Sequence, residues 1–187
     1  KWLVPRMFRF SAGNRDIDIR LSTSERLATF AADGIDLCIR YGRGNYPGLT
    51  AELLLKEELT PVCSPALLSQ GPPLQQLSDL RHHTLIHDEF PIDWVAWLRS
   101  AGITDIDARR GIRFQSSVHA VQAAVQGGGI VLGRSALVAD DLKSGRLVQP
   151  FTLSLPTDLA YYVVYPPEAI KRHKVRAFRD WLLEEAT

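Results

Sequence analysis

The sequence predicts an α/β fold made of two lobes, and two observations carry that prediction. Stretches with the period of a strand alternate with stretches with the period of a helix along nearly all 187 residues, a pattern typical of parallel strands joined by crossover helices. Two strand-like segments, 58–65 and 159–166, have the positions expected of passages between lobes. The expected lobes are therefore residues 1–60 with 163–187, and residues 61–162.

The individual elements follow from the spacing of the apolar residues. Apolar residues that recur every three to four positions predict helices, and alternating or continuous apolar runs predict strands. Capping residues such as Ser24 and glycines such as Gly34 mark the ends. Helices are expected at 2–11, 24–34, 64–80 (two short ones), 93–102, 116–129, 135–145 and from residue 170 onward. Strands are expected at 16–21, 35–41, 53–63, 83–88, 111–115, 130–133, 145–151 and 159–166.

The composition is that of an ordinary folded soluble domain, with 45% hydrophobic residues, 23% charged residues and a net charge of +1. This even charge balance argues against a free-standing DNA-binding domain, which usually has a basic face. The most basic segment, 170–179, also carries an apolar stripe, so we expect it to dock on a core as a solvated helix. The stripe consists of Ile170, Val175, Phe178, Trp181 and Leu182.

The location of the protein is predicted to be the cytoplasm. No apolar run approaches the length of a membrane span, and the first ten residues do not form a cleavable signal. Cys38 and Cys63 lie in apolar runs without metal-site or disulfide spacing, so we expect small buried hydrophobes. Lys1 opens directly into an amphipathic pattern with no initiator Met or capping residue, and we therefore expect a fragment of a longer protein.

Four segments that follow one another along the chain have a recognisable pattern: KWLVPRMFRF, FAADGIDLCIRYGRGNYPGL, FQSSVHAVQAAVQGGGIVLGRSALVADDLKSGRLVQPF and LAYYVVYPPEAIKRHKVRAFRDWLLEE. Together they resemble the effector-binding domain of LysR-type transcriptional regulators, in the branch of the glycine-cleavage activator and the β-lactamase regulators. The resemblance covers essentially the whole chain. It implies two Rossmann-like subdomains joined by two crossover strands, as in type II periplasmic binding proteins.

The resemblance also implies partners. A small-molecule effector would bind in the cleft between the subdomains, and an N-terminal winged helix-turn-helix, absent from this chain, would bind promoter DNA. The first strand of such a domain, and a loop that contributes to the pocket, normally precede the segment that starts at Lys1. A homodimer or homotetramer is expected, in which helix 2–11 of one copy packs against helix 117–126 of another. No cofactor is implied.

Ser116 and Ser117 are the first candidates for an effector site, because they stand where a strand passes into a helix. The unpaired N–H groups and the dipole of a helix N-terminus attract a carboxylate or phosphate, and the hydroxyls add donors. Members of the resembled family place ligand contacts here. A serine that merely caps the helix would explain the same pattern without a ligand.

The loop after the strand 35–41 supplies further candidates, Tyr41, Gly42 and Arg43. Glycine allows a close backbone approach, and arginine offers a planar fork for an anion. A tight surface turn with Arg43 in solvent is an equal alternative. On the last strand, either Tyr161 or Tyr162 should face the cleft. The resemblance favours Tyr161, although a tyrosine satisfied within the core is an alternative.

His87 is the last candidate, at the end of a strand of the second lobe. His87, Asp88 and Ser116 do not make a hydrolase, since no GxSxG nucleophile signature accompanies them. The remaining histidines have no metal-site spacing, and the glycines of 127–129 follow a helix, which is the wrong context for a dinucleotide fingerprint. We therefore expect no enzyme and no metal. The ligand is expected to be an anionic metabolite, and the main rival is a stand-alone solute-binding protein of the same fold.

Overall fold

A computed structural model describes residues 1–24, 29–90 and 92–187, and the chain divides into two compact units. Unit 1 is Glu58–Thr157 together with Lys1, and unit 2 is Trp2–Glu57 with Asp158–Thr187. The backbone therefore passes between the units twice, a few residues before each boundary expected from the sequence. Each unit has its own sheet in the described residues, so the chain does not form one continuous sheet.

Unit 1 is built on a five-stranded sheet with the order β5-β4-β6-β3-β7. Its strands are β3 (Glu58–Val62), β4 (Leu85–Asp88), β5 (Ile112–Phe114), β6 (Ile130–Arg134) and β7 (Leu155–Pro156). β4 runs parallel to β5 and β6, whereas β3 runs antiparallel to β6 and β7. The expected parallel arrangement therefore holds only for the three strands joined by helical crossovers. β3, which enters directly from unit 2, makes the sheet mixed.

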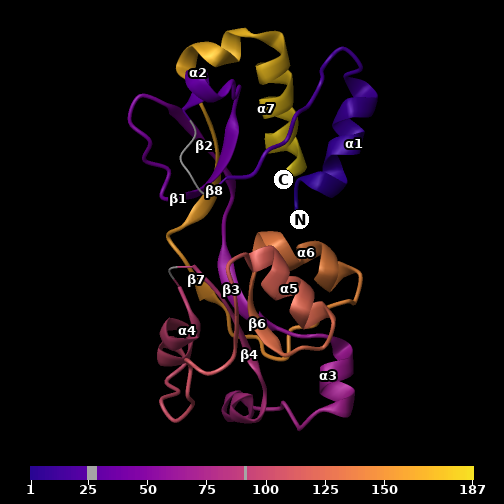
Figure 1. Ribbon diagram of the computed structural model, residues 1–187, viewed down its shortest axis with the longest axis vertical. Helices are drawn as coiled ribbons and strands as arrows, with labels where there is room; N and C mark the ends of the chain where they lie inside the picture. Colours follow the sequence, from indigo (N-terminus) through magenta and orange to yellow (C-terminus); the bar gives the residue numbers. More distant parts are fainter. Residues whose placement is uncertain (25–28, 91) are drawn as a thin grey trace. The chain divides into compact units, whose positions relative to one another are not determined.

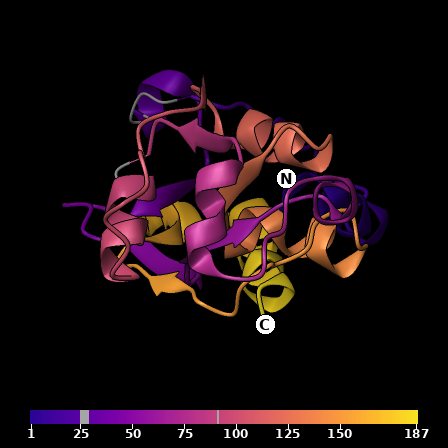
Figure 2. The same ribbon diagram turned by 90° about the horizontal axis from the view of Figure 1, so that it is seen from below.

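Helices cover both faces of this sheet. They are α3 (Pro65–Gln70), η1 (Leu77–His82), α4 (Trp94–Ser100), α5 (Ser117–Val125) and α6 (Ser135–Lys143). Leu85 and Ile130 point to the core that contains Trp94 and Trp97 of α4, whereas their neighbours Ile86 and Val131 point to the core under α5. This alternation is the period-2 geometry of strands. Figures 1 and 2 accordingly show α4 on one side of the strands of unit 1 and α5 on the other.

Unit 2 is built on a three-stranded antiparallel sheet with the order β1-β8-β2. The strands are β1 (Cys38–Gly42), β2 (Thr50–Leu55) and β8 (Ala160–Tyr165), and the helices are α1 (Val4–Gly13), α2 (Phe30–Asp33), η2 (Pro167–Lys171) and α7 (His173–Glu185). Val175 and Leu182 of α7 are almost completely buried against Val163 of β8. The apolar stripe of the final helix thus docks on a core, as the sequence predicted.

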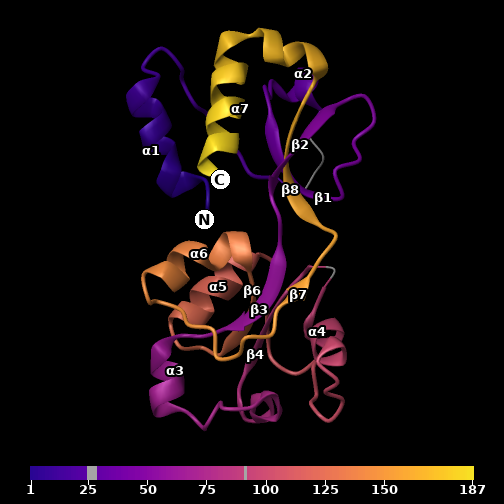
Figure 3. The same ribbon diagram turned by 180° about the vertical axis from the view of Figure 1, so that it is seen from behind.

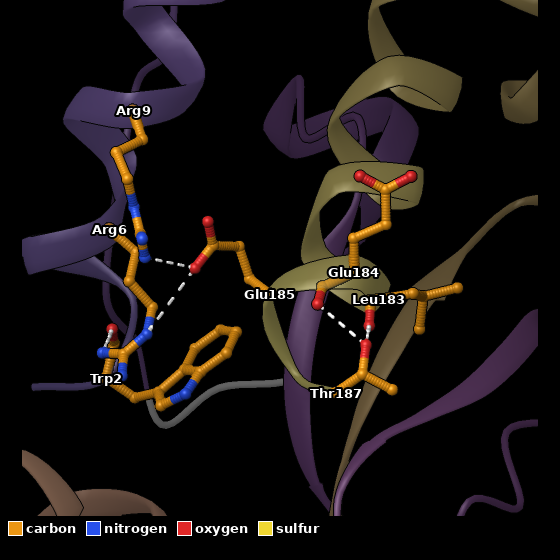
Figure 4. Close-up of polar contacts among 7 residues, drawn as sticks. All are labelled: Trp2, Arg6, Arg9, Leu183, Glu184, Glu185 and Thr187. Carbon is orange, nitrogen blue, oxygen red and sulfur yellow. Dashed lines mark hydrogen bonds and ion pairs between the residues drawn. The ribbon is translucent and has the colours of Figure 1, made fainter.

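The helices α1 and α7 lie side by side within unit 2 (Figure 3). Phe10 is 2% exposed, and its ring centroid lies 5.0 Å from that of Phe178 and 5.2 Å from that of Trp181. At the end of α7, Glu185 forms an ion pair with Arg9 and lies 3.9 Å from the Nε of Arg6 (Figure 4). Apolar packing therefore contributes most of the stabilisation of the contact between α1 and α7, because exposed ion pairs contribute little to stability.

Three sequence predictions about elements were wrong. Residues 16–21 do not form a strand, because no described strand lies beside them to accept hydrogen bonds. The segment 145–151 forms only an isolated bridge between Val148 and Cys63. The final helix begins at His173 rather than at residue 170, after the separate turn η2. The helix expected at 24–34 lies partly outside the described residues, but its end at Gly34 is confirmed by a left-handed φ of 64°.

The two cysteines differ in how far their side chains are buried. Cys63 is fully buried, and this burial raises the pKa of its thiol to about 11. Cys38 is half-buried, and burial also raises its pKa. Both thiols are free. No helix in the described part of the chain has the length and apolarity needed to cross a bilayer.

Acid is expected to destabilise unit 1 through Asp141 of α6, which is 2% exposed. Burial raises the pKa of this carboxyl, but hydrogen bonds from Lys1 and Arg146 outweigh burial and hold the pKa below its ordinary value. A depressed carboxyl pKa stabilises the fold above the unfolded-state value, and the stabilisation is lost as the pH falls through the folded-state value, below about pH 4. In urea unfolding, the stabilities of the wild type and of Asp141→Asn should therefore differ at pH 7, and the difference should shrink as the pH falls below about 4. A difference that does not change with pH would contradict this assignment.

Candidate functional site

The N-terminus of α5 brings two predicted site residues together. Ser116 occupies the N-cap position with extended backbone angles, but its hydroxyl makes no capping hydrogen bond. Ser117 is the first helical residue and is 6% exposed. The capping role that was the alternative for these serines is therefore not what the Ser116 hydroxyl does in the structure. At its half-buried position, this hydroxyl is available to another partner.

A buried arginine lies against this helix end. Arg134, the last residue of β6, is 2% exposed. Its guanidinium nitrogen donates to the Asp88 carboxylate at 3.2 Å and to the Ser117 hydroxyl at 3.3 Å. Its Cζ lies 3.4 Å from the ring centroid of Phe90, a cation–π contact. The sequence reasoning missed Arg134, because an arginine after an apolar run reads as a strand end; its burial is visible only in the fold.

His87 is held inside unit 1 rather than presented to a ligand. It is 4% exposed, and its Nε2 donates to the carbonyl of Arg110 at 3.1 Å. With Asp88 and Trp94 it borders a pocket of about 10 Å³, which has room for a single water molecule. The Nε2 of His87 is thus engaged by the backbone. Asp88, for its part, is paired with Arg134.

In unit 2, the predicted residues lie on β1 and β8. Tyr41 pairs with Tyr161 across the two strands, and their ring centroids are 4.9 Å apart. Tyr161 also packs against the hydrophobic core of the unit. Arg43 forms an ion pair with Asp158 at 2.9 Å, and its side chain is 73% exposed. The structure thus places Arg43 in solvent, where its guanidinium remains available to an anion because an exposed pair is weak.

The opposite face of β1 and β8 carries a second set of side chains. The guanidinium of Arg40 lies 5.1 Å from the ring centroid of Tyr46. A Cβ on Gly42 would lie 2.6 Å from the Tyr46 hydroxyl, and a Cβ on Gly44 would lie 2.7 Å from the ring of Tyr162. The absence of a Cβ thus allows Tyr46 to pack closely against Gly42 and Tyr162 to pack closely against Gly44. This close approach explains the glycines without a ligand.

The described residues contain no group of three or more histidine, cysteine, aspartate or glutamate side chains that would hold a metal ion. In unit 1, the N-terminus of α5 has the Ser116 hydroxyl and the buried cation Arg134; in unit 2, β1 and β8 carry the paired rings of Tyr41 and Tyr161.

Comparison with known proteins gives a consistent picture. The model of the LysR substrate binding domain matches residues 1–187. The glycine cleavage system transcriptional activator of Escherichia coli K12 is 40% identical over 185 residues, which cover 99% of this chain and 61% of that protein. The transcriptional activator AmpR of Pseudomonas aeruginosa is 34% identical over 186 residues, covering 99% of this chain and 62% of that protein. This chain thus spans about three fifths of these relatives.

Solved structures agree with the sequence relatives. The effector domain of AmpR from P. aeruginosa has a TM-score of 0.79 at 34% identity, over 99% of this chain and 88% of that one. The Citrobacter freundii effector binding domain, in a variant with three substitutions, has a TM-score of 0.81 at 26% identity, over 99% of this chain and 92% of that one. These matches confirm the α/β fold of an effector-binding domain with periplasmic-binding-protein-like architecture, and the branch named in the sequence analysis.

Proposed function

The chain belongs to the family of LysR substrate-binding domains, and on this premise we propose that it is the effector-sensing part of a bacterial transcription regulator. It binds a small molecule between its two units and controls transcription through a winged helix-turn-helix elsewhere in the same polypeptide. The relatives that support this are named as transcriptional activators. Their names favour a cytoplasmic regulator without catalytic activity over the rival, a stand-alone solute-binding protein.

The effector site that we propose draws on both units. Unit 1 contributes Ser116 and Ser117, and unit 2 contributes Tyr41, Gly42, Arg43 and Tyr161. The observation that carries the proposal is the N-terminus of α5, where the Ser116 hydroxyl does not cap the helix and the Arg134 guanidinium contacts Ser117. A helix N-terminus carries about half a positive charge. The ligand is accordingly an anionic metabolite, such as an amino acid or a cell-wall peptide.

The proposed mechanism is a hinge that the ligand biases. The units are the two regulatory subdomains, and the backbone passes between them after Glu57 and after Thr157. A ligand that contacts both units binds one angle between them better than another, and it therefore shifts the population toward that angle. In the intact regulator, this shift repositions the DNA-binding domains on the promoter.

Calorimetric titration with a panel of amino acids and cell-wall peptides tests the site. At least one compound is expected to bind the wild-type domain, and both Ser116→Ala and Tyr161→Phe should weaken it about tenfold, the usual cost of one hydrogen bond to a charged group. The matched controls are Ser69→Ala, on the exposed end of α3, and Tyr165→Phe, on the same strand as Tyr161 but bonded to Glu52. Neither control should change the affinity. If the controls weaken binding as much as the site variants do, the site assignment is wrong.

The subunit interface that we propose pairs α1 of one copy with α5 of another. Phe8 and Val4 of α1 are 77% and 48% exposed, and Val118 of α5 is 41% exposed; exposed apolar side chains of this size are candidates for an interface. Phe8→Glu is expected to convert a dimer into a monomer, because it buries an unpaired charge in the contact. Sedimentation over a range of protein concentrations measures this. Leu68→Glu, a control on exposed α3, should leave association unchanged, and a wild type that is monomeric throughout would refute the interface.

A further inference from the structure

The loop that joins β1 to β2 carries Arg43 and is rich in glycine. Gly44 and Gly48 have φ angles of +78° and +77°, and a segment with several glycines has unusual backbone freedom. The side chain of Arg43 is 73% exposed, and its ion pair with Asp158 is of the exposed kind that contributes little. If Arg43 is to meet an anion at a fixed place, other contacts have to fix the backbone that carries it.

Two tyrosine rings lie against the backbone on either side of Arg43. A Cβ on Gly42 would lie 2.6 Å from the Tyr46 hydroxyl oxygen, and a Cβ on Gly44 would lie 2.7 Å from the ring of Tyr162. Tyr162 belongs to β8, so its position is set by the sheet. Tyr46 belongs to the loop itself, and it can hold Gly42 in place only if its own ring is held.

Arg40 of β1 holds the ring of Tyr46. Its guanidinium lies 5.1 Å from the centroid of that ring and 5.7 Å from the ring centroid of Phe30 in α2, distances at which a cation is attracted to a ring face. Arg40 also lies opposite Tyr162 in the pairing of β1 with β8. The backbone on both sides of Arg43 is thus connected to the sheet, directly by Tyr162 and indirectly by Tyr46.

The last residue of β1, Gly42, has a steric rather than a conformational reason to be glycine. Its φ is not positive, and glycine destabilises a strand relative to alanine. The atom nearest to an added Cβ is the Tyr46 hydroxyl oxygen at 2.6 Å, and the next is the Cζ of the same ring at 3.6 Å, an ordinary contact distance. The approach of the Tyr46 hydroxyl is therefore what excludes alanine at this position.

We propose that Tyr46 is a positioning residue of the effector site, which fixes the backbone of residues 42–44 so that Arg43 meets the anionic group of the effector. Tyr46 does not touch the effector itself. This inference rests on the proposed function, because it concerns the loop of unit 2 that carries Arg43.

The first test needs no effector. Nitrogen-15 relaxation is measured for the amides of Arg43 and Gly44, whose order parameters are expected to be about 0.85 in the wild type and below about 0.6 in Gly42→Ala, because the added Cβ displaces Tyr46. Gly42→Ala/Tyr46→Phe should restore the wild-type value, since without the hydroxyl oxygen the nearest atom lies at 3.6 Å. Gly13→Ala is the matched control: no heavy atom lies within 4 Å of its added Cβ, so the loop should stay ordered.

The second test is calorimetric titration with the compound that binds the wild type most tightly in the panel of amino acids and cell-wall peptides. Arg43→Gln is expected to weaken its binding about tenfold, as the loss of one hydrogen bond to a charged group does. In the Gly42→Ala background, the same change should weaken binding by less than about twofold, because residues that act together have non-additive effects. In the Gly42→Ala/Tyr46→Phe background, the effect of about tenfold should return.

Three results would each refute the role of Tyr46 while the proposed function stands. Gly42→Ala could leave the loop ordered, Tyr46→Phe could fail to restore the order that Gly42→Ala removes, or Arg43→Gln could cost about tenfold in every background. If Arg43→Gln does not change the binding of the wild type, Arg43 lies outside the site and the inference fails with that assignment. If no compound of the panel binds the wild type, the proposed function and this inference are both wrong.

Discussion

Replacing Gly129 with alanine is expected to lower the free energy of unfolding of unit 1 by about 4 kcal/mol. Gly129 has a φ of +147°, a region that L side chains rarely adopt, and an added Cβ would lie 2.3 Å from the carbonyl oxygen of Thr84. That carbonyl cannot move away freely, because it accepts the hydrogen bond of the Ile130 N–H at 2.9 Å. This bond lies where β6 begins its pairing with β4. The substitution therefore strains the centre of the sheet.

Gly145 provides the matched control for this prediction. It also has a positive φ, +73°, but no heavy atom lies within 4 Å of an added Cβ. Gly145→Ala should therefore lose only the conformational cost, about 1 kcal/mol. Urea unfolding followed by circular dichroism measures both variants. Equal losses would show that the close approach to Thr84 is not what requires glycine at 129.

Replacing Phe10 with alanine is expected to destabilise unit 2 by about 3–5 kcal/mol. Phe10 is 2% exposed and packs edge-on against Phe178, at an interplanar angle of 83°, and against Trp181. Its removal leaves a cavity between α1 and α7 that the two remaining rings do not fill. The ion pairs of Glu185 with Arg6 and Arg9 do not compensate, because charges near the surface contribute at most about 1 kcal/mol.

Phe8 lies on the same helix and is 77% exposed, so Phe8→Ala is the control. It should change the free energy of unfolding by less than about 0.5 kcal/mol when measured on the monomer. Chemical denaturation at low protein concentration, which keeps association out of the measurement, separates the two variants. A loss for Phe8→Ala as large as that for Phe10→Ala would mean that α1 does not dock on α7 through Phe10.

The fold was predictable from the sequence where local signals agree with packing. Residues 2–11 were expected as a helix and lie largely in α1, and the apolar stripe of 170–182 was expected to dock and does so. The failures have a common physical origin. Residues 16–21 alternate as a strand does, but a strand exists only with a neighbour to share hydrogen bonds. Val148 forms a single bridge with Cys63. Tertiary contacts likewise decide whether the residues on either side of this bridge also pair as a strand.

Only the backbone features of the proposed site were predictable from the sequence. A strand that runs into a helix at Ser116 is visible in the sequence, because serine is a common residue at helix starts. The buried pair of Arg134 and Asp88 joins residues 46 positions apart, and no local pattern signals such a contact. The exposure of Arg43 and the hydrogen bond of His87 to the Arg110 carbonyl also depend on distant segments. Sequence spacing alone does not determine them.

We propose that a small anionic molecule changes the angle between the two units, and a distance measured between them tests this directly. Spin labels are attached to cysteines introduced by Ser69→Cys in unit 1 and Lys171→Cys in unit 2, both at exposed positions. Cys38 is replaced by serine, and Cys63, which is buried, is left unchanged. The distance distribution is recorded by electron–electron double resonance with and without the tightest-binding amino acid of the panel. Saturating ligand is expected to shift the distribution in the wild type, and Ser116→Ala and Tyr161→Phe are expected to raise the ligand concentration that this shift requires. A distribution that saturating ligand leaves unchanged would contradict the account.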